Sequence, residues 1–242
     1  MKLKAYIIQT MCIAVAILAI SGCAKDNYTA PQSILSGHVV YNGTAVGVRS
    51  NGNTSGGAQL EIWQHGYQLF TKIPVYIAQD GSYSALLFDG DYLIDRLAGA
   101  PWVPQPTDSV LVHVRGNTTQ DITVTPYFFV SAVTYTHTAN TVTATITIVK
   151  PTGSTGTLSA VRLYVGRTII TDQTSSDAVI SIPAASIVVG TPFTATVTIP
   201  ATLLPGGLYA SQAAGGIYAR VGVLSTQASE LQYSTATFIP LP

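Results

Sequence analysis

The stretch VTATITIV at residues 142–149 decides the fold class of this chain. Its threonines alternate with apolar residues. Side chains of a β-strand point to opposite faces in turn, so this strand has one apolar face and one face that carries hydroxyls. The same period of two recurs from residue 34 onward, and no stretch there has the 3.6-residue period of a packed amphipathic helix beyond a single turn near 184–188. The pattern predicts an all-β protein whose strands bury one face only.

The expected strands fall into two series that are separated at Pro126, because a proline cannot donate a hydrogen bond to a ladder. Their short, even spacing is typical of β-sandwiches. The first series is expected at 35–41, 59–63, 73–78, 82–88, 91–97, 110–115 and 119–125, and the second at 130–136, 142–149, 160–166, 178–182, 193–199, 218–224 and 235–239. The sequence therefore predicts two β-sandwich domains, at 34–126 and 127–242, each with a core of its own.

Composition excludes two classes of protein. Of the 242 residues 47% are hydrophobic and only 9% are charged, against about 25% charged residues in an average soluble domain, so the chain is not a disordered polyelectrolyte. Eleven basic residues balance eleven acidic ones, and the loss of Lys2 and Lys4 with an N-terminal signal leaves a small negative charge. We therefore expect no nucleic-acid partner.

The N-terminus has the pattern of a secretory signal peptide at residues 1–22. Lys2 and Lys4 precede an apolar run over 5–20 that contains only Gln9 and Thr10 as polar breaks. The alternative is a transmembrane helix, but the run is shorter than the roughly 20 residues that span a bilayer, and small residues follow it. We expect the segment to be cleaved.

The segment ISGC at 20–23 resembles the bacterial lipobox. The resemblance implies that Cys23 becomes the first mature residue and carries a diacylglyceryl thioether, usually with a further amide-linked acyl chain. Two or more chains anchor a protein stably in a membrane where one does not. Because Cys12 leaves with the signal, the mature chain has no second thiol and no disulfide.

We expect residues 23–33 to form a lipidated tether. Their sequence also indicates which side of the outer membrane the protein faces. Lys25-Asp26 resembles the surface-export signal of Bacteroidetes-type lipoproteins, a lysine followed by acidic residues. Asn27 stands where a second acidic residue is common. The resemblance implies a protein that faces the cell exterior, with a periplasm-facing orientation as the alternative.

Three motifs of the first series, LSGHVV at 35–40, DGSY at 80–83 and LFDGDY at 87–92, resemble the transthyretin-like carboxypeptidase regulatory domain. YARVGV at 218–223 is similar to the sixth strand of fibronectin type III domains and implies an immunoglobulin/fibronectin III-like second sandwich. Together with VTPY at 124–127, they make the mature chain resemble a two-domain lipoprotein family of unknown function. Its members tend to occur beside starch-utilisation-type glycan uptake systems of Bacteroidetes outer membranes. The resemblance implies an outer-membrane location, with a glycan or outer-membrane glycan-uptake proteins as partners, and it supplies no catalytic residue.

A direct search for reactive motifs finds no phosphate-binding Gly-rich loop, no Gly-x-Ser-x-Gly elbow and no histidine pair at metal-ligand spacing. We therefore predict no catalytic residue, no cofactor and no metal site. Asp89 and Asp91 flank a turn glycine and could join a calcium site, but Asp-Gly is the expected chemistry of a hairpin turn.

Two loops could bind a sugar. Trp102 lies between prolines in APWVPQP at 100–106, where fixed φ angles would hold the indole for stacking on a sugar. The alternative is that Trp102 packs against the sandwich edge or into the domain interface. The loop RSNGNTSGG at 49–57 could offer its amides to sugar hydroxyls, or it could be a solvated insertion.

The hypothesis that these observations favour is an outer-membrane lipoprotein that acts as a non-catalytic accessory in glycan binding or uptake. The alternative is a structural or adhesive cell-surface module that recognises a partner protein. An enzyme is the third option, because a fold alone does not exclude an activity.

Replacing Cys23 by serine should release the protein from the membrane, because no other thiol of the mature chain can accept the lipid. Membrane fractionation and detergent partitioning measure this. Cys12→Ser is the matched control and should stay membrane-bound. Recovery of Cys23→Ser in the membrane at the wild-type level would contradict lipidation at Cys23.

Overall fold

The computed structural model describes residues 29–50, 57–66, 71–96, 99–105, 109–210, 212–213 and 215–241. Throughout these residues the regular structure is β, apart from one 3₁₀ turn, η1 (Ala184–Ser186), and the prediction of an all-β protein is confirmed. None of the described segments forms a helix of the length and apolarity that a membrane crossing requires. The expected signal peptide and Cys23 lie outside the described residues.

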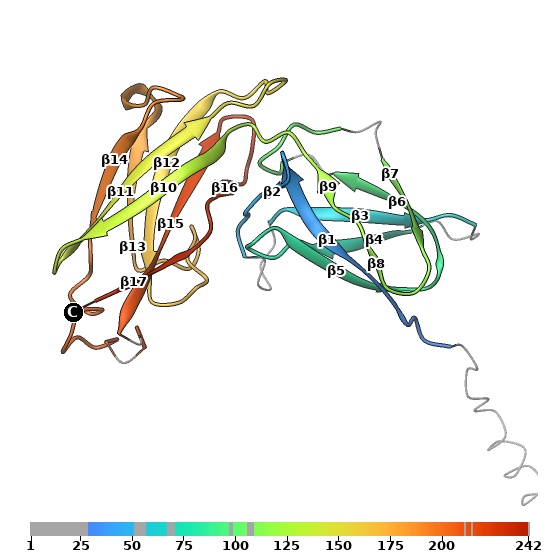
Figure 1. Ribbon diagram of the computed structural model, residues 1–242, viewed down its shortest axis with the longest axis horizontal. Coiled ribbons are helices and arrows are strands. Elements are labelled where there is room, and N and C mark those ends of the chain that lie inside the picture. Colours follow the sequence, from blue (N-terminus) through green and yellow to red (C-terminus); the bar gives the residue numbers. More distant parts are fainter. Residues whose placement is uncertain are drawn as a thin grey trace, which may run out of the picture. The chain divides into compact units, whose positions relative to one another are not determined.

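The first sandwich, drawn from blue to green in Figure 1, consists of two sheets. The first sheet is organised by β1, which pairs with β2 and β5 in antiparallel fashion and with β8 and β9 in parallel. The second sheet has the strand order β4-β3-β6-β7. The strands are β1 (Ser33–Tyr41), β2 (Thr44–Ala45), β3 (Gln59–Gln64), β4 (Lys72–Tyr76), β5 (Ser82–Leu87), β6 (Gly90–Arg96), β7 (Val110–Val114), β8 (Thr118–Thr119) and β9 (Ile122–Thr123).

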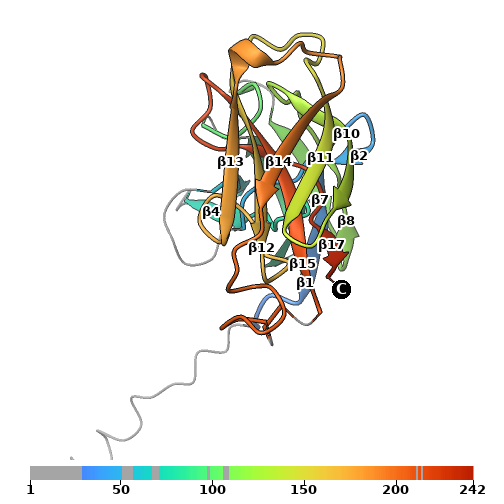
Figure 2. The ribbon, with the colours of Figure 1, turned by 90° about the vertical axis from the view of Figure 1, so that its left-hand side faces the viewer.

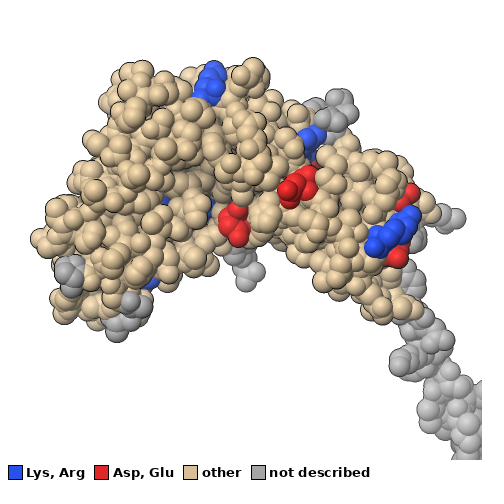
Figure 3. All heavy atoms as spheres, viewed as in Figure 1, with Lys and Arg blue, Asp and Glu red and all other residues tan. Residues whose placement is uncertain are grey.

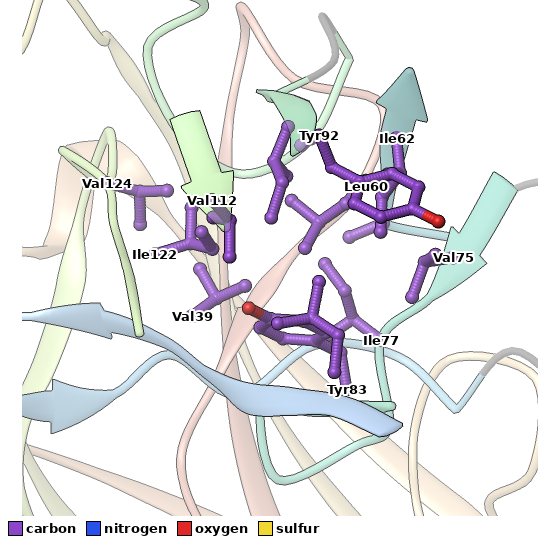
Figure 4. Packing of buried hydrophobic residues seen from close by; sticks show 14 of the residues in the cluster. Val39, Leu60, Ile62, Val75, Ile77, Tyr83, Tyr92, Val112, Ile122 and Val124 are labelled. Carbon is purple, nitrogen blue, oxygen red and sulfur yellow. The ribbon is translucent and has the colours of Figure 1, made fainter. Parts of the chain in front are cut away.

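The core of this sandwich follows from the alternation in its strands. On β1, Leu35 and Val39 are fully buried, whereas Ile34 and His38 face outward. Residues from both sheets meet in the apolar layer that Figure 4 shows, where the rings of Tyr83 and Tyr92 lie among aliphatic side chains. Burial of this apolar layer is the main force that holds the two sheets together.

The expected strand at 119–125 is broken into β8 and β9 where the chain passes Gly37 of β1. The chain passes β1 at Gln120, whose carbonyl oxygen would lie 1.9 Å from a Cβ atom at position 37. Gln120 N donates to Ser36 O at 2.8 Å, which holds the chain against β1 between the two short pairings. A glycine is therefore required in the first strand by this close backbone approach.

The second sandwich, yellow to red in Figure 1, also has two sheets. One has the strand order β10-β11-β14; the other has β13-β12-β15-β16, with β17 paired to β15. Strands β13 and β14 lie side by side in Figure 2, where the edges of the two sheets approach each other. The strands are β10 (Phe129–His137), β11 (Thr141–Val149), β12 (Leu158–Gly166), β13 (Ala178–Pro183), β14 (Phe193–Thr198), β15 (Gly216–Ser225), β16 (Gln232–Tyr233) and β17 (Thr237–Pro240).

The deciding stretch of the sequence lies on β11 and behaves as its pattern predicts. Its apolar residues, such as Val142 and Ile146, are fully buried, and its threonines form part of the outer face. Thr143 lies opposite Thr196 of β14, and their hydroxyl oxygens are 2.9 Å apart. Hydroxyls rather than charges cover such outer faces, and charged side chains are few on the surface in Figure 3.

Gly37→Ala should lower the free energy of unfolding by about 1 to 3 kcal/mol or more, because the added methyl group collides with main chain that cannot move aside. Urea denaturation measures the change. Gly90→Ala is the control, since the Cβ atom there meets the flexible end of the Gln64 side chain. Equal stability of the two variants would contradict the close approach.

Candidate functional site

A buried arginine joins the two sandwiches. Arg220 of β15 is 1% exposed, and its Nε donates to Ser234 O at 2.8 Å. Its Nη2 reaches the first sandwich and donates to Val48 O at 3.0 Å and to Gln79 O at 2.5 Å. Burial lowers the pKa of Arg220 to about 10, so the group remains a cation at neutral pH. The guanidinium carbon lies 4.5 Å from the centre of the Tyr233 ring, which adds a cation–π contact.

Two further contacts hold the same junction. Arg49 forms a buried, bidentate ion pair with Glu230, with nitrogen–oxygen distances of 2.8 and 3.0 Å. Burial raises the pKa of Glu230 even though the hydrogen bonds from Arg49 oppose this shift. Tyr233 N donates to Gly47 O at 2.9 Å in an isolated β-bridge. Main-chain and side-chain bonds therefore fix the register between the sandwiches.

A pocket of about 410 Å³ opens beside this junction, a volume within the range typical of small-molecule sites. Its walls come from both sandwiches and combine hydroxyls, amides and aromatic rings. The ring of Phe129 lies 5.4 Å from that of Tyr41, which holds it at the pocket wall. The lining residues are Thr44, Ala45, Gly47, Gln79 and Asp80 of the first sandwich, and residues 129–133, 232–235 and 237 of the second.

The polar groups of this pocket have a distinct chemistry. Among its described lining residues Asp80 is the one that carries a full charge, and hydrogen bonds from Ser82 Oγ and N hold the pKa of its carboxyl below the usual value. The side-chain oxygen of Gln79 is buried and has no hydrogen-bond partner in the part of the chain that is described. A buried acceptor without a partner costs free energy. With Asp80 and the hydroxyls of its walls, the pocket can accept hydrogen bonds from ligand hydroxyls, and it can pack an apolar ring face.

A second, more open hollow of about 430 Å³ lies on the outer face of the first sandwich and is called the groove below. It is lined by Ser36, Gly37 and His38 of β1, by Tyr76 and Ala78, by Ser82, Tyr83 and Ser84 of β5, and by Thr119. Tyr76 is 60% exposed, whereas Tyr83 is buried and donates a hydrogen bond to Gln120 O. Burial raises the pKa of Tyr83, which therefore stays a neutral phenol.

The prediction that Trp102 is an exposed stacking residue is wrong. The side chain is fully buried in the core of the first sandwich, and its residue forms an isolated bridge with Pro126. The neighbouring main chain is held by bonds from Val103 N to Thr125 O and from Tyr127 N to Pro101 O. The indole thus lies inward, as the packing alternative expected, and the ring is not available to a sugar.

The other candidates have structural roles. Of the loop at 49–57, residues 51–56 lie outside the described residues, and Arg49 is committed to Glu230. Asp89 accepts hydrogen bonds from Ser33 and Gly116, which matches the turn interpretation. Across the described ranges no three His, Cys, Asp or Glu side chains come together as a metal site would require.

Sequence reasoning missed the residues that form the pocket and the buried arginine of the junction beside it. In the sequence, Asp80 was noted only as a turn residue of the DGSY motif, and Arg220 only as a member of the YARVGV motif. Both lie at strand ends or on outer strand faces that read as solvent-exposed in the sequence. The one available signal was Arg220 itself, a charged residue in a strand that is otherwise apolar on both faces.

Two family profiles match the chain. Residues 33–125 match the N-terminal domain of a protein of unknown function, DUF3823, and residues 128–237 match a C-terminal domain of unknown function, DUF3823_C. No curated protein matches the chain.

Solved structures of three relatives cover nearly the same part of the chain. A DUF3823 family protein from Bacteroides ovatus is 39% identical with a TM-score of 0.77, and one from Parabacteroides merdae is 31% identical with a TM-score of 0.74. A protein from Bacteroides uniformis, for which carbohydrate binding has been proposed, is 18% identical with a TM-score of 0.65. Each comparison covers 87% of this chain and 100% of the other.

Trp102→Ala should lower the free energy of unfolding by about 3 to 5 kcal/mol, since it removes a large side chain from a packed core. Urea denaturation followed by circular dichroism measures the loss. Leu111, which is 54% exposed, provides the control, and Leu111→Ala should stay within about 0.5 kcal/mol of wild type. A melting temperature of Trp102→Ala close to that of wild type would contradict the core position.

Proposed function

Because the chain belongs to the DUF3823 family of two-domain all-β proteins, for which no function is known, we propose its function from the junction pocket: it binds a glycan there as a non-catalytic accessory of glycan capture or uptake. The observation that carries the proposal is the pairing of a carboxylate and an amide side chain with an aromatic wall. Sugars present hydroxyl donors at their edges and apolar CH faces, which match such walls.

The rigidity of the pocket supports this function. Its two halves are joined by Arg220, by the Arg49–Glu230 pair and by the bridge at Gly47, so that the walls are in place before a ligand arrives. Preorganisation lowers the entropic cost of binding. The relative from Bacteroides uniformis for which carbohydrate binding has been proposed shares the fold and agrees with this function.

The proposal includes a location. Lipid on Cys23 would anchor the protein in the outer membrane, and the Lys25-Asp26 segment favours exposure at the cell exterior. Placed there, a glycan-binding pocket would meet polysaccharides before they are taken up. Outer-membrane glycan-uptake proteins are the proposed partners, because they would lie in the same membrane.

The kind of groups in the pocket supports the non-catalytic role. Asp80 is the single carboxylate among its described lining residues, and hydrogen bonds keep it ionised. Glycoside hydrolysis uses a pair of carboxyl groups, one of which must be protonated. The pocket offers groups that bind a sugar but no such acid–base pair.

A soluble form that begins at Lys25 should bind one or more of the neutral polysaccharides pullulan, galactomannan, xyloglucan and laminarin. Affinity gel electrophoresis identifies the polymer, and titration calorimetry gives its affinity. Gln79→Ala should weaken binding about five-fold, because it removes a polar side chain from the pocket wall and leaves the main-chain carbonyl that Arg220 needs.

Asn140→Ala is the matched control, since this exposed turn residue lies outside the pocket and should leave the affinity unchanged. If the wild type binds none of the polymers, glycan capture is wrong and the structural or adhesive alternative is favoured.

A further inference from the structure

We propose that the junction pocket and the groove form one continuous surface for an extended, uncharged glycan chain, with Tyr76 stacking on a sugar ring beyond the pocket. This inference rests on the proposed function. It adds the class of glycan, a polymer rather than a single sugar, and a second point of contact.

The two hollows meet at the turn that connects β4 and β5. Gln79 and Asp80 line the pocket, whereas Ala78 and Ser82 of the same turn line the groove. Ser82 Oγ donates to Asp80 Oδ1 at 2.7 Å, so side chains of the two hollows touch. Gly81, with a φ of 87°, allows the tight turn between them. A ligand that leaves the pocket past Asp80 therefore enters the groove.

The groove has the dimensions of a binding site for more than one sugar. On the outer face of the sheet, Ser36 lies opposite Ser84 on one side and opposite Thr119 on the other. The bridge next to β5 places Tyr76 beside Ser84. The paired segments β8, β1 and β5 are spaced by about 4.8 Å, and the bridge adds β4 of the second sheet beyond β5, so the row extends over more than about 10 Å. That length exceeds a single sugar ring.

The chemistry of the row suits sugars. Tyr76 is 60% exposed and offers an aromatic face on which the CH face of a sugar can pack. The hydroxyls of Ser36, Ser84 and Thr119 can each donate and accept hydrogen bonds, as sugar hydroxyls do. The groove thus repeats, in more open form, the combination of polar groups and an aromatic wall found in the pocket.

The charges on this surface select an uncharged chain. Neither hollow has a lysine or an arginine among its described lining residues, and Asp80 is ionised between them. Asp121 adds a second carboxylate 3.9 Å from His38 Nδ1 in the groove. An acidic polysaccharide would bring its carboxylates against these groups without a fixed cation to pair with. We therefore assign a neutral glycan.

Calorimetric titration with the neutral polymer found in the screen, and with short oligosaccharides from its partial hydrolysis, tests the continuous surface. The polymer should bind more tightly than the short fragments. Tyr76→Ala should weaken polymer binding about ten-fold and change fragment binding less than about two-fold, because only a long chain reaches the ring. Tyr76→Phe keeps the ring and should keep most of the affinity. Gln79→Ala should weaken both ligands.

The outcomes separate this inference from the proposed function. If Gln79→Ala weakens binding and Tyr76→Ala changes nothing, the pocket binds the glycan alone and the extended surface is wrong. Polygalacturonate that binds as tightly as the neutral polymers overturns the assignment of an uncharged chain. Absence of binding to every polymer overturns the proposed function itself. Leu111→Ala, an exposed apolar residue outside both hollows, controls for a general loss of surface apolarity.

Discussion

The arrangement of the two sandwiches depends on a cation buried between them. Arg220 satisfies three main-chain carbonyl oxygens, one in its own sandwich and two in the other, and it stacks on Tyr233. If the sandwiches moved apart by a small distance, Val48 O and Gln79 O would lose this donor, and the guanidinium would lose two of its three hydrogen bonds in a medium of low polarity. The junction therefore has one favoured geometry, and the pocket beside it inherits that geometry.

A junction of this kind contributes more to specificity than to stability. Burying Arg220 and the Arg49–Glu230 pair carries a desolvation cost, visible in the lowered pKa of Arg220 and the raised pKa of Glu230. Apolar residues of equal volume could join two sandwiches with as much stability, but they would tolerate sliding. Directional hydrogen bonds do not tolerate sliding. Because the walls of the site come from two domains, a fixed register holds its lining groups in position.

The faces of the strands could be predicted from local pattern, as the period of two along β11 shows. The need for a glycine at position 37 could not, because it arises where Gln120 passes β1. The break between β8 and β9 could not be predicted, because it depends on a contact with a strand some eighty residues earlier in the chain. The prediction of an exposed Trp102 was wrong for a related reason. Prolines on either side predict that the ring is held in place, but not on which side of the chain it lies.

The order of neighbouring residues is enough to predict the class of fold, the positions of most strands, the low surface charge and a lipid anchor. The site depends instead on contacts between residues far apart in the chain. Asp80 and Gln79 gain their role only because strands β10, β15 and β16 of the second sandwich lie against their turn, and Arg220 is buried only because the first sandwich covers the outer face of β15. Period and composition report which face of a strand is apolar. They do not report which polar face is later enclosed by another domain, because that depends on contacts between residues far apart in the chain.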